Sequence, residues 1–247
     1  MTSVQEAPLT GLRALVTGAT TGIGRATALR LSADGAAEVV VHGRDARRGA
    51  QTVDEIAASG GIARFVAADA SDPEDLRRLA KEVGDIDILV NNAGISVWGP
   101  TGDFDLTVND DMFDDNVRAA FVLVGALAPA MVDRGSGSII NLSSMAARIG
   151  LVGGASYSAT KASLEAMTRA WTAEYSPHGV RVNAVAPGPV YTDIVPREFQ
   201  EKVAERTALG RVAEPTEIAG VIAFLASPQA SYITGAVIAV DGGASAI

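Results

Sequence analysis

Short apolar runs alternate along this chain with longer amphipathic segments. The runs are rich in β-branched residues and predict strands at residues 12–17, 38–42, 64–68, 86–91, 138–142, 180–186 and 236–240. Because these runs are continuously apolar, we expect them to be buried on both faces, as in a parallel sheet covered by helices. The amphipathic segments predict helices at 24–33, 46–59, 73–83, 111–134, 156–176 and 215–226.

The regular alternation of strand and helix predicts an α/β fold with a doubly wound parallel sheet of seven strands and helices on both faces. A chain of 247 residues that is 48% hydrophobic can bury one large core. No repeat or linker divides it, so we expect one domain over residues 11–247, preceded by a loosely held N-terminal tail at residues 1–10.

Composition narrows the possible functions. The net charge of −9 argues against binding to nucleic acid. Residues 1–6 are polar, and no run of about 20 apolar residues would span a membrane, so we expect a soluble cytoplasmic protein. With no cysteine and two histidines, His42 and His178, the chain offers little material for a metal site or a Ser/His triad, and we expect no metal.

A glycine-rich segment follows the first predicted strand and opens the first predicted helix. It spans residues 17–24 with the spacing G-x-x-x-G-x-G, which differs from the commoner G-x-G-x-x-G. Glycines allow a tight turn and close backbone approach, and a helix N-terminus offers free N–H groups to a pyrophosphate. The segment therefore predicts a dinucleotide site.

The end of the second predicted strand bears on the choice of dinucleotide. An acidic side chain there would hold the 2′-hydroxyl of NAD, whereas an arginine accommodates the 2′-phosphate of NADP. Gly43 and Arg44 occupy this place, which favours NADP over NAD. The alternative is a solvated Arg44, with Asp45 capping the next helix.

Tyr157 and Lys161 are four residues apart in a predicted helix, and the chain has only three lysines and four tyrosines. Residues at this spacing share one helix face, and an ammonium group near a phenol favours the phenolate. The pair is a candidate acid/base site. The alternative is a surface tyrosine beside an exposed lysine.

Several motifs in order make the chain resemble the classical short-chain dehydrogenase/reductase family over about residues 10–243. These motifs are residues 17–24, 91–94, Asn116, Ser144, Tyr157 with Lys161, and residues 187–188. Residues 209–217, 232–235 and 241–243 are similar to the subgroup that includes 3-oxoacyl-[acyl-carrier-protein] reductases and many secondary-alcohol dehydrogenases. The resemblance implies a Rossmann-type fold.

The resemblance also implies catalytic roles. Tyr157 would be the general acid in carbonyl reduction and the base in the reverse direction. Lys161 would hold the nicotinamide ribose and, together with the positive nicotinamide of the oxidised cofactor, lower the Tyr157 pKa. Ser144 would hydrogen-bond the carbonyl oxygen, its distance from Tyr157 selecting it over Ser143. Asn116 would lie at a helix irregularity and position a water that relays protons to Lys161.

Further cofactor contacts are implied by position. Asp69 would bind the adenine amine, Ala93 and Gly94 the adenosine ribose, and residues 187–192 the carboxamide. Asp69 could equally cap a turn, and Asn91 and Asn92 could be structural amides between strands. The complete predicted cofactor set is Gly18, Thr20, Thr21, Gly22, Ile23, Gly24, Gly43, Arg44, Asp69, Ala70, Asn91, Ala93, Gly94, Tyr157, Lys161, Pro187, Gly188, Val190 and Thr192.

The implied substrate pocket has a mostly apolar lining, which suits a ketone or secondary alcohol with hydrophobic flanks, including a 3-oxoacyl thioester. Its predicted residues are Ser96, Trp98, Ser144, Ala146, Leu151, Val152, Tyr157, Tyr191, Ile194, Val195 and Phe199. Arg134, Arg148 and His178 are candidate contacts for an acidic carrier protein. The alternatives are a dehydrogenase of a sugar, polyol or other small alcohol, a sugar-nucleotide epimerase or dehydratase, and a non-catalytic nucleotide-binding regulator.

The helix predicted to start at residue 111 is apolar almost all round over residues 121–131. A helix with two apolar faces needs a second partner besides its own sheet. We therefore expect a homo-oligomer, and the resemblance implies a homotetramer.

Overall fold

Seven parallel strands form one continuous sheet in the computed structural model, which describes residues 7–193 and 195–247. The strand order is β3-β2-β1-β4-β5-β6-β7, as expected for a doubly wound fold. The strands are β1 (Arg13–Val16), β2 (Glu38–Gly43), β3 (Ala63–Ala67), β4 (Ile88–Asn91), β5 (Gly137–Leu142), β6 (Val180–Pro187) and β7 (Val237–Val240). The predicted seven-stranded α/β architecture is confirmed.

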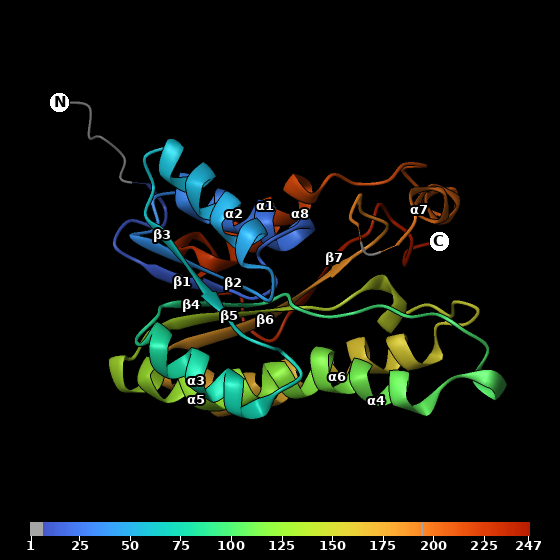
Figure 1. Cartoon of the computed structure of the whole chain (residues 1–247), viewed down its shortest axis with the longest axis horizontal. Helices are drawn as coiled ribbons and strands as arrows, with labels where there is room; N and C mark the ends of the chain where they lie inside the picture. Colours follow the sequence, from blue (N-terminus) through green and yellow to red (C-terminus); the bar gives the residue numbers. More distant parts are fainter. Residues whose placement is uncertain (1–6, 194) are drawn as a thin grey trace.

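Helices cover both faces of this sheet (Figure 1). One face carries α1 (Gly22–Ala33), α2 (Ala46–Ala58) and α8 (Pro215–Ala226). The other carries α3 (Pro73–Val83), α4 (Leu106–Phe113), α5 (Ala119–Arg134) and α6 (Ala155–Tyr175). Short helix α7 (Arg197–Ala204) follows β6, and the remaining turns are η1 (Thr101–Asp103), η2 (Asp114–Arg118), η3 (Met145–Ala147), η4 (Ser176–His178) and η5 (Pro228–Ala230).

The sheet separates two hydrophobic cores, and adjacent residues of one strand enter different cores. Val16 packs with Ile218 and Ile222 beneath α8, whereas its neighbour Leu15 packs with Leu123 beneath α5. Each of these side chains is fully or almost fully buried, which contributes about 1.5–3 kcal/mol per large aliphatic residue. The need to bury both strand faces explains why the strands are continuously apolar.

Three local features differ from the sequence-based expectations. The helix expected at 111–134 starts at Leu106 and passes through the π-helical turn η2 before α5. Helix α7 was not predicted. Leu9 is completely buried and Thr10 pairs with Ala36, so the packed domain starts before residue 11.

The continuous run Leu106–Arg134 is long and apolar enough to cross a membrane by length and composition, and half of its apolar window is buried inside the domain. This burial arises because α5 packs on the sheet and on α3, with Leu123, Leu127 and Met131 in the core. The run is therefore a core helix of the α/β domain.

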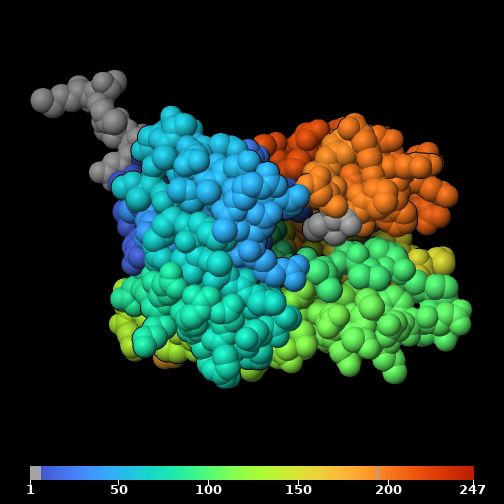
Figure 2. Space-filling view, in the orientation of Figure 1, coloured from blue at the N-terminus to red at the C-terminus, as the bar shows by residue number. Residues whose placement is uncertain are grey.

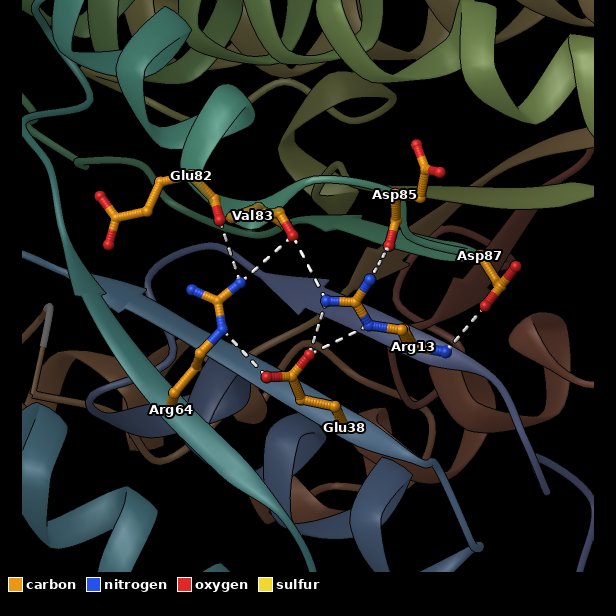
Figure 3. Close-up of polar contacts among 7 residues, drawn as sticks. All are labelled: Arg13, Glu38, Arg64, Glu82, Val83, Asp85 and Asp87. Carbon is orange, nitrogen blue, oxygen red and sulfur yellow. Dashed lines mark hydrogen bonds and ion pairs between the residues drawn. The ribbon is translucent and has the colours of Figure 1, made fainter.

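The amino ends of the first three strands are joined by an ion-pair cluster (Figure 3). Glu38 on β2 accepts hydrogen bonds from Arg13 on β1 at 2.7 and 3.0 Å and from Arg64 on β3 at 2.9 Å. The two arginines also donate to the Val83 carbonyl at the end of α3. Burial alone would raise the pKa of Glu38, but the two arginines hold it below its ordinary value. This cluster stabilises the sheet edge opposite to the carboxyl ends.

Candidate active site

The carboxyl ends of the strands form the site because the sheet order reverses between β1 and β4. The chain leaves these adjacent strands toward opposite faces, which opens a crevice between the loops that follow them. In Figure 2 the orange segment that contains α7 stands over the green segment after β4, with a hollow between them. Two cavities meet there.

The first cavity is a cleft over the glycine loop. It is lined by Gly18, Thr20, Thr21, Gly22, Ile23, Gly24, His42, Gly43, Arg44, Ala68, Ala70, Asn92, Ala93, Gly94, Ile95, Asp115 and Thr192. Most predicted cofactor residues outside the catalytic group lie in this lining. At Gly24 an added Cβ would meet the Gly18 carbonyl and the Asn92 amide within contact distance, so only glycine fits there.

Thr17 and Asn92 hold the glycine loop in place. The Thr17 hydroxyl oxygen accepts the backbone N–H groups of Asn92 and Ala93, each at 2.9 Å. The Asn92 amide donates to the carbonyls of Thr17 at 2.8 Å and Gly18 at 3.2 Å. Asn92 therefore has the structural amide role, and the loop is organised before any ligand binds.

His42, in β2, accepts a hydrogen bond from the same loop and was not predicted as a site residue. Its Nδ1 accepts the Gly18 N–H at 3.3 Å, and its Nε2 lies 3.2 Å from the Ala68 carbonyl, which requires the Nε2–H tautomer. Burial lowers the pKa of His42 to about 4, so the ring is neutral near pH 7. His42 lies inside an apolar strand, so nothing in the sequence indicated this role.

Arg44 lies at the rim of the cleft with an exposed side chain. In residues 7–193 and 195–247 no carboxylate forms an ion pair with Arg44. Asp45 caps α2 by accepting the N–H groups of Arg47 and Arg48. The capping role of Asp45 thus coexists with an Arg44 guanidinium that can bind an anion.

The second cavity contains Ser144, Tyr157 and Lys161, which the structure brings together. The Lys161 ammonium donates to the Leu142 carbonyl at 2.8 Å and lies 5.8 Å from the Tyr157 ring centroid. Lys161 is only 6% exposed, so the alternative of an exposed surface lysine is wrong. The three side chains converge from the end of β5 and the first turns of α6.

Burial dominates the ionisation of this group. It lowers the pKa of Lys161 to about 8. Burial also raises the pKa of Tyr157, while a hydrogen bond with the Ser144 hydroxyl acts in the opposite direction. The protein alone therefore keeps the phenol protonated, which suits a proton donor.

Asn116 lies at the predicted helix irregularity, inside the π-helical turn η2. Its Oδ1 accepts the Ile95 N–H at 2.8 Å, and its Nδ2 donates to the Ile95 carbonyl at 2.9 Å and the Thr160 hydroxyl at 3.0 Å. An added Cβ at Gly94 would lie 2.5 Å from Asn116 Oδ1, which explains the glycine there. Asn116 thus ties the loop after β4 to α6, next to Lys161.

Two predicted cofactor residues serve the framework. Asn91 donates from Nδ2 to Asn141 Oδ1 at 2.8 Å and so ties β4 to β5, which is the structural alternative for this residue. The Oδ1 atom of Asp69 accepts both the N–H and the hydroxyl of Ser71, at 3.0 and 2.9 Å. Neither residue belongs to the lining of the cleft, although Ala68 and Ala70 do.

The second cavity has a volume of ≈ 170 Å³ and a mostly apolar lining. Trp98 lies between Tyr157 and Phe199, 5.7 Å from each ring centroid, and its Nε1 donates to the Ser96 hydroxyl at 2.8 Å. Ser96, Trp98, Ala146, Leu151, Val195 and Phe199 line this pocket as predicted, together with Pro187, Gly188, Val190 and Thr192 from the cofactor set.

Two other residues predicted for the substrate pocket lie outside this lining. Val152 is fully exposed to solvent, and Tyr191 stacks on Arg197 at 4.5 Å outside the pocket. Ile194 lies outside the described residues. A strand-to-helix loop has no simple periodicity, so the sequence could not tell inward from outward positions.

Helix α7 contributes pocket residues that sequence reasoning missed. Gln200 is 3% exposed and donates to the carbonyls of Thr192 at 2.8 Å and Val195 at 2.9 Å, which closes the loop after β6 over the pocket. Val203 lines the pocket one turn later, and Met145 lines it from η3. The apolar spacing of Phe199 and Val203 was the one signal for this helix.

Two of the three basic residues proposed for an acidic partner lie away from the site. Arg134 pairs with Asp85 and Asp87, at the amino end of β4, and His178 precedes the amino end of β6. Both are therefore at the sheet edge opposite to the cavities. Arg148 remains on the site side, where it pairs with Glu165.

Together the two cavities define a class of protein. A glycine cradle at a helix N-terminus fits the diphosphate of a dinucleotide, and a buried Tyr/Lys/Ser group faces an apolar pocket beside it. This arrangement is that of a dinucleotide-dependent oxidoreductase acting on a small organic substrate.

Comparisons with known proteins agree with this class. A family model described as Enoyl-(Acyl carrier protein) reductase matches residues 18–245. A solved short chain dehydrogenase/reductase family protein is 47% identical, with a TM-score of 0.91 over 97% of this chain and 100% of the other. The chain belongs to the short-chain dehydrogenase/reductase family, which confirms the resemblance and the assignment as an oxidoreductase.

Named relatives differ in their reported reactions. The 3-oxoacyl-[acyl-carrier-protein] reductase FabG of Staphylococcus aureus strain Mu50 is 38% identical over 93% of this chain and 96% of its own. The gluconate 5-dehydrogenase of Gluconobacter oxydans strain 621H is 36% identical over 95% of each chain. A blue fluorescent protein from a metagenomic library, solved with NADPH, is 39% identical with a TM-score of 0.91, over 96% of this chain and 99% of its own.

Proposed function

We propose that this protein is an NADP(H)-dependent ketoreductase that interconverts a ketone with apolar flanks and its secondary alcohol. This proposal rests on one observation: Ser144, Tyr157 and Lys161 converge in the apolar pocket, where it adjoins the dinucleotide cleft. Charge placed near a carbonyl oxygen in such a partly closed site stabilises the transition state strongly.

In this proposal each residue has a separate task. The Tyr157 phenol, kept protonated by burial, donates its proton to the carbonyl oxygen. Ser144 donates a hydrogen bond to the same oxygen. Lys161, fixed by the Leu142 carbonyl, holds the ribose hydroxyls and supplies positive charge beside the phenol. The nicotinamide cofactor would supply or accept the hydride. Tyr157 would regain its proton from Lys161 through the ribose hydroxyls, and Asn116 would position the water that returns a proton to Lys161.

We assign NADP as the preferred cofactor on the basis of Arg44. Its guanidinium stands at the rim of the cleft without a carboxylate partner in the described part of the chain, and Gly43 leaves the competing acidic position empty. The NADPH complex of a 39% identical protein supports this choice. Arg44→Ala should weaken NADPH binding by about 1.5–3 kcal/mol and leave NADH binding nearly unchanged.

Arg47→Ala is the matched control, because Arg47 is also an exposed arginine, lies three residues along the chain and does not line the cleft. Equal losses for NADPH and NADH in Arg44→Ala, or equal effects of the two substitutions, would refute the 2′-phosphate assignment.

The pocket favours a 3-oxoacyl thioester over a polyol. Its lining contains Trp98, Leu151, Val195 and Phe199, and Lys161 is the only charged side chain among the described residues of the lining. Apolar side chains form most of this lining, which suits an acyl chain better than a hydrated polyol. The 3-oxoacyl carrier-protein reductases among the relatives support this substrate class.

The test is a screen of NADPH oxidation by the purified protein. We expect turnover with a β-ketoacyl thioester and with hydrophobic ketones, and a much lower kcat/KM with 5-ketogluconate. Preferred reduction of 5-ketogluconate would replace this substrate class with that of the gluconate dehydrogenase relative. If no carbonyl compound oxidised NADPH, the assignment of this protein as a ketoreductase would be refuted.

We also propose a cytoplasmic homotetramer assembled in part through α5 and α6. Phe121 on α5 is 60% exposed and stacks with Trp171 of α6 at 6.3 Å, although both helices already pack on the sheet. A second copy would cover this apolar surface. Light scattering of wild type and Phe121→Glu at micromolar concentration tests the proposal, and a wild-type monomer would contradict it.

A further inference from the structure

Glu165 is a buried acidic residue on α6 that has no task in the reaction proposed above. It is 8% exposed and lies four residues after Lys161, which in turn lies four residues after Tyr157. Residues four apart share one helix face, so these three side chains form one polar row along α6. Two members of the row are the proposed catalytic pair, and the third is a carboxylate whose burial needs an explanation.

Two adjacent serines at the end of β5 bind different members of this row. The buried Ser143 hydroxyl donates to Glu165 Oε1 at 2.9 Å, whereas the Ser144 hydroxyl hydrogen-bonds with the Tyr157 phenol. Ser144 has extended backbone, with a φ of −161° and a ψ of 155°. Because successive side chains of an extended chain point to opposite sides, the direction of Ser143 also sets that of Ser144.

The carboxylate gives the Ser143 hydroxyl one preferred direction. A carboxylate only accepts hydrogen bonds, so the serine proton points toward it. The other acceptor near this hydroxyl, the Lys161 carbonyl, is farther away at 3.3 Å. Arg148, which follows η3, donates from Nε to the two carboxylate oxygens of Glu165 at 3.4 and 3.5 Å. This guanidinium offsets part of the cost of burying the carboxylate.

A neutral link between α6 and β5 lies three residues farther along the helix. The completely buried Thr168 hydroxyl accepts a hydrogen bond from Asn141 Nδ2 at 2.9 Å. A neutral pair of this kind joins the two elements without the desolvation cost of a carboxylate. Holding α6 on β5 therefore does not require Glu165, and its carboxylate calls for a more specific role.

We propose that Glu165 is a positioning residue for the reaction: its carboxylate holds Ser143 toward α6 and so directs the Ser144 hydroxyl at the carbonyl oxygen of the substrate. Both serines line the apolar pocket, so without this acceptor either hydroxyl could turn into it. Glu165 lines neither cavity and acts through the serines alone. The inference rests on the proposed function, because it presumes that Ser144 binds a carbonyl oxygen.

Glu165→Leu removes the acceptor, and Glu165→Gln keeps a carbonyl oxygen for the Ser143 hydroxyl. With the ketone that wild type reduces fastest, Glu165→Leu should slow single-turnover oxidation of NADPH about 10- to 100-fold, as for a misplaced reacting group. Glu165→Gln should be at least about threefold faster than Glu165→Leu, because it retains a neutral hydrogen bond. NADPH affinity should stay near that of wild type in both variants.

A double-mutant cycle identifies the residue through which Glu165 acts. Ser144→Ala alone should slow the reaction about 100-fold or more, as for one lost donor to a developing oxyanion. In that background Glu165→Leu should slow it by less than about threefold further, since the hydroxyl that it positions is already absent. Ser143→Ala deletes a single oxygen and serves if Glu165→Leu does not fold; it should slow the reaction about tenfold, but only while Ser144 is present.

Thr168→Val is the matched control, because it also breaks a buried hydrogen bond between α6 and β5. Urea melts should show that it is less stable than wild type, while its single-turnover rate stays within about twofold of wild type. A purely structural role for Glu165 predicts instead that Glu165→Leu and Thr168→Val have similar rates.

The outcomes separate this inference from the proposed function. Wild-type rates in Glu165→Leu and Ser143→Ala, a Glu165→Gln protein no faster than Glu165→Leu, or an equal loss of rate from Glu165→Leu with and without Ser144 would each overturn the positioning role and leave a ketoreductase. If Ser144→Ala reduces the ketone as fast as wild type, or if wild type reduces no ketone, the proposed function and this inference fail together.

Discussion

Gly24 offers a direct test of the dinucleotide cradle, because the structure leaves no room for a side chain there. An alanine Cβ would lie 2.8 Å from the Gly18 carbonyl carbon and closer still to its oxygen and to the Asn92 amide. These neighbours are the Gly18 backbone and the hydrogen-bonded Asn92 side chain, neither of which can easily move aside, so the glycine loop must shift.

The expected magnitude combines two opposing effects. Replacing a helical glycine by alanine gains about 1 kcal/mol of helix propensity, and overpacking costs about 1–3 kcal/mol. The free energy of unfolding should therefore fall by up to about 2 kcal/mol in Gly24→Ala. Displacement of the loop N–H groups should weaken NADPH binding at least tenfold, as for one lost hydrogen bond to a charged group.

Gly125→Ala is the matched control, since Gly125 lies in α5 and an added Cβ there would meet nothing within 4 Å. It should stabilise the fold by up to about 1 kcal/mol and leave NADPH affinity unchanged. Urea unfolding and NADPH fluorescence titration measure both quantities. A Gly24→Ala protein with wild-type stability and an NADPH affinity within threefold of wild type would refute the assignment of the glycine loop as the dinucleotide site.

Three further predictions concern charge and packing. Burial lowers the pKa of Lys161 from its ordinary value of 10.5 to about 8 in the folded protein. Wild type should therefore gain stability relative to Lys161→Met as the pH rises from 8 to 10.5. If urea melts gave the same difference in unfolding free energy between the two proteins at every pH, the burial of Lys161 would be contradicted. Glu38→Gln should cost about 0.5–1 kcal/mol at pH 7. Because the pKa of Glu38 is lowered on folding, that deficit should shrink as the pH falls through the folded-state pKa, and a pH-independent deficit would exclude the ion pairs as its source. Trp98→Ala, which removes the ring between Tyr157 and Phe199, should raise KM for a hydrophobic ketone about tenfold with a smaller effect on kcat; an unchanged KM would place substrate elsewhere.

The sequence predicted the fold because its signals are local and repeated. Strands buried on both faces must be continuously apolar, as at Leu15 and Val16, and helix starts such as Asp72 with Pro73 carry their own capping chemistry. The glycine loop and the Tyr157/Lys161 spacing were visible for the same reason, since each lies within one turn or one loop.

Properties that depend on distant contacts were not accessible from the sequence. Asp115 belongs to an acidic stretch from Asp110, which looks like a solvated helix face until the π-helical turn places it in the cleft. Val152 and Tyr191 were placed in the pocket by their position in the chain, and only the folded loops show that they point away from it. Arg134 was misplaced although the strand and helix alternation already fixed its position: α5 precedes the parallel strand β5, so its last residue must lie at the amino edge of the sheet, opposite to the site.

Tyr157→Phe tests the central claim most directly, because it removes one oxygen and leaves the aromatic contact with Trp98 in place. With the carbonyl compound that the wild-type protein reduces fastest, single-turnover oxidation of bound NADPH should slow by at least about 100-fold, the contribution of a positioned proton donor. NADPH affinity should stay within threefold of wild type. A Tyr157→Phe protein that reduces the same ketone at more than half of the wild-type rate would contradict the assignment of Tyr157 as the proton donor.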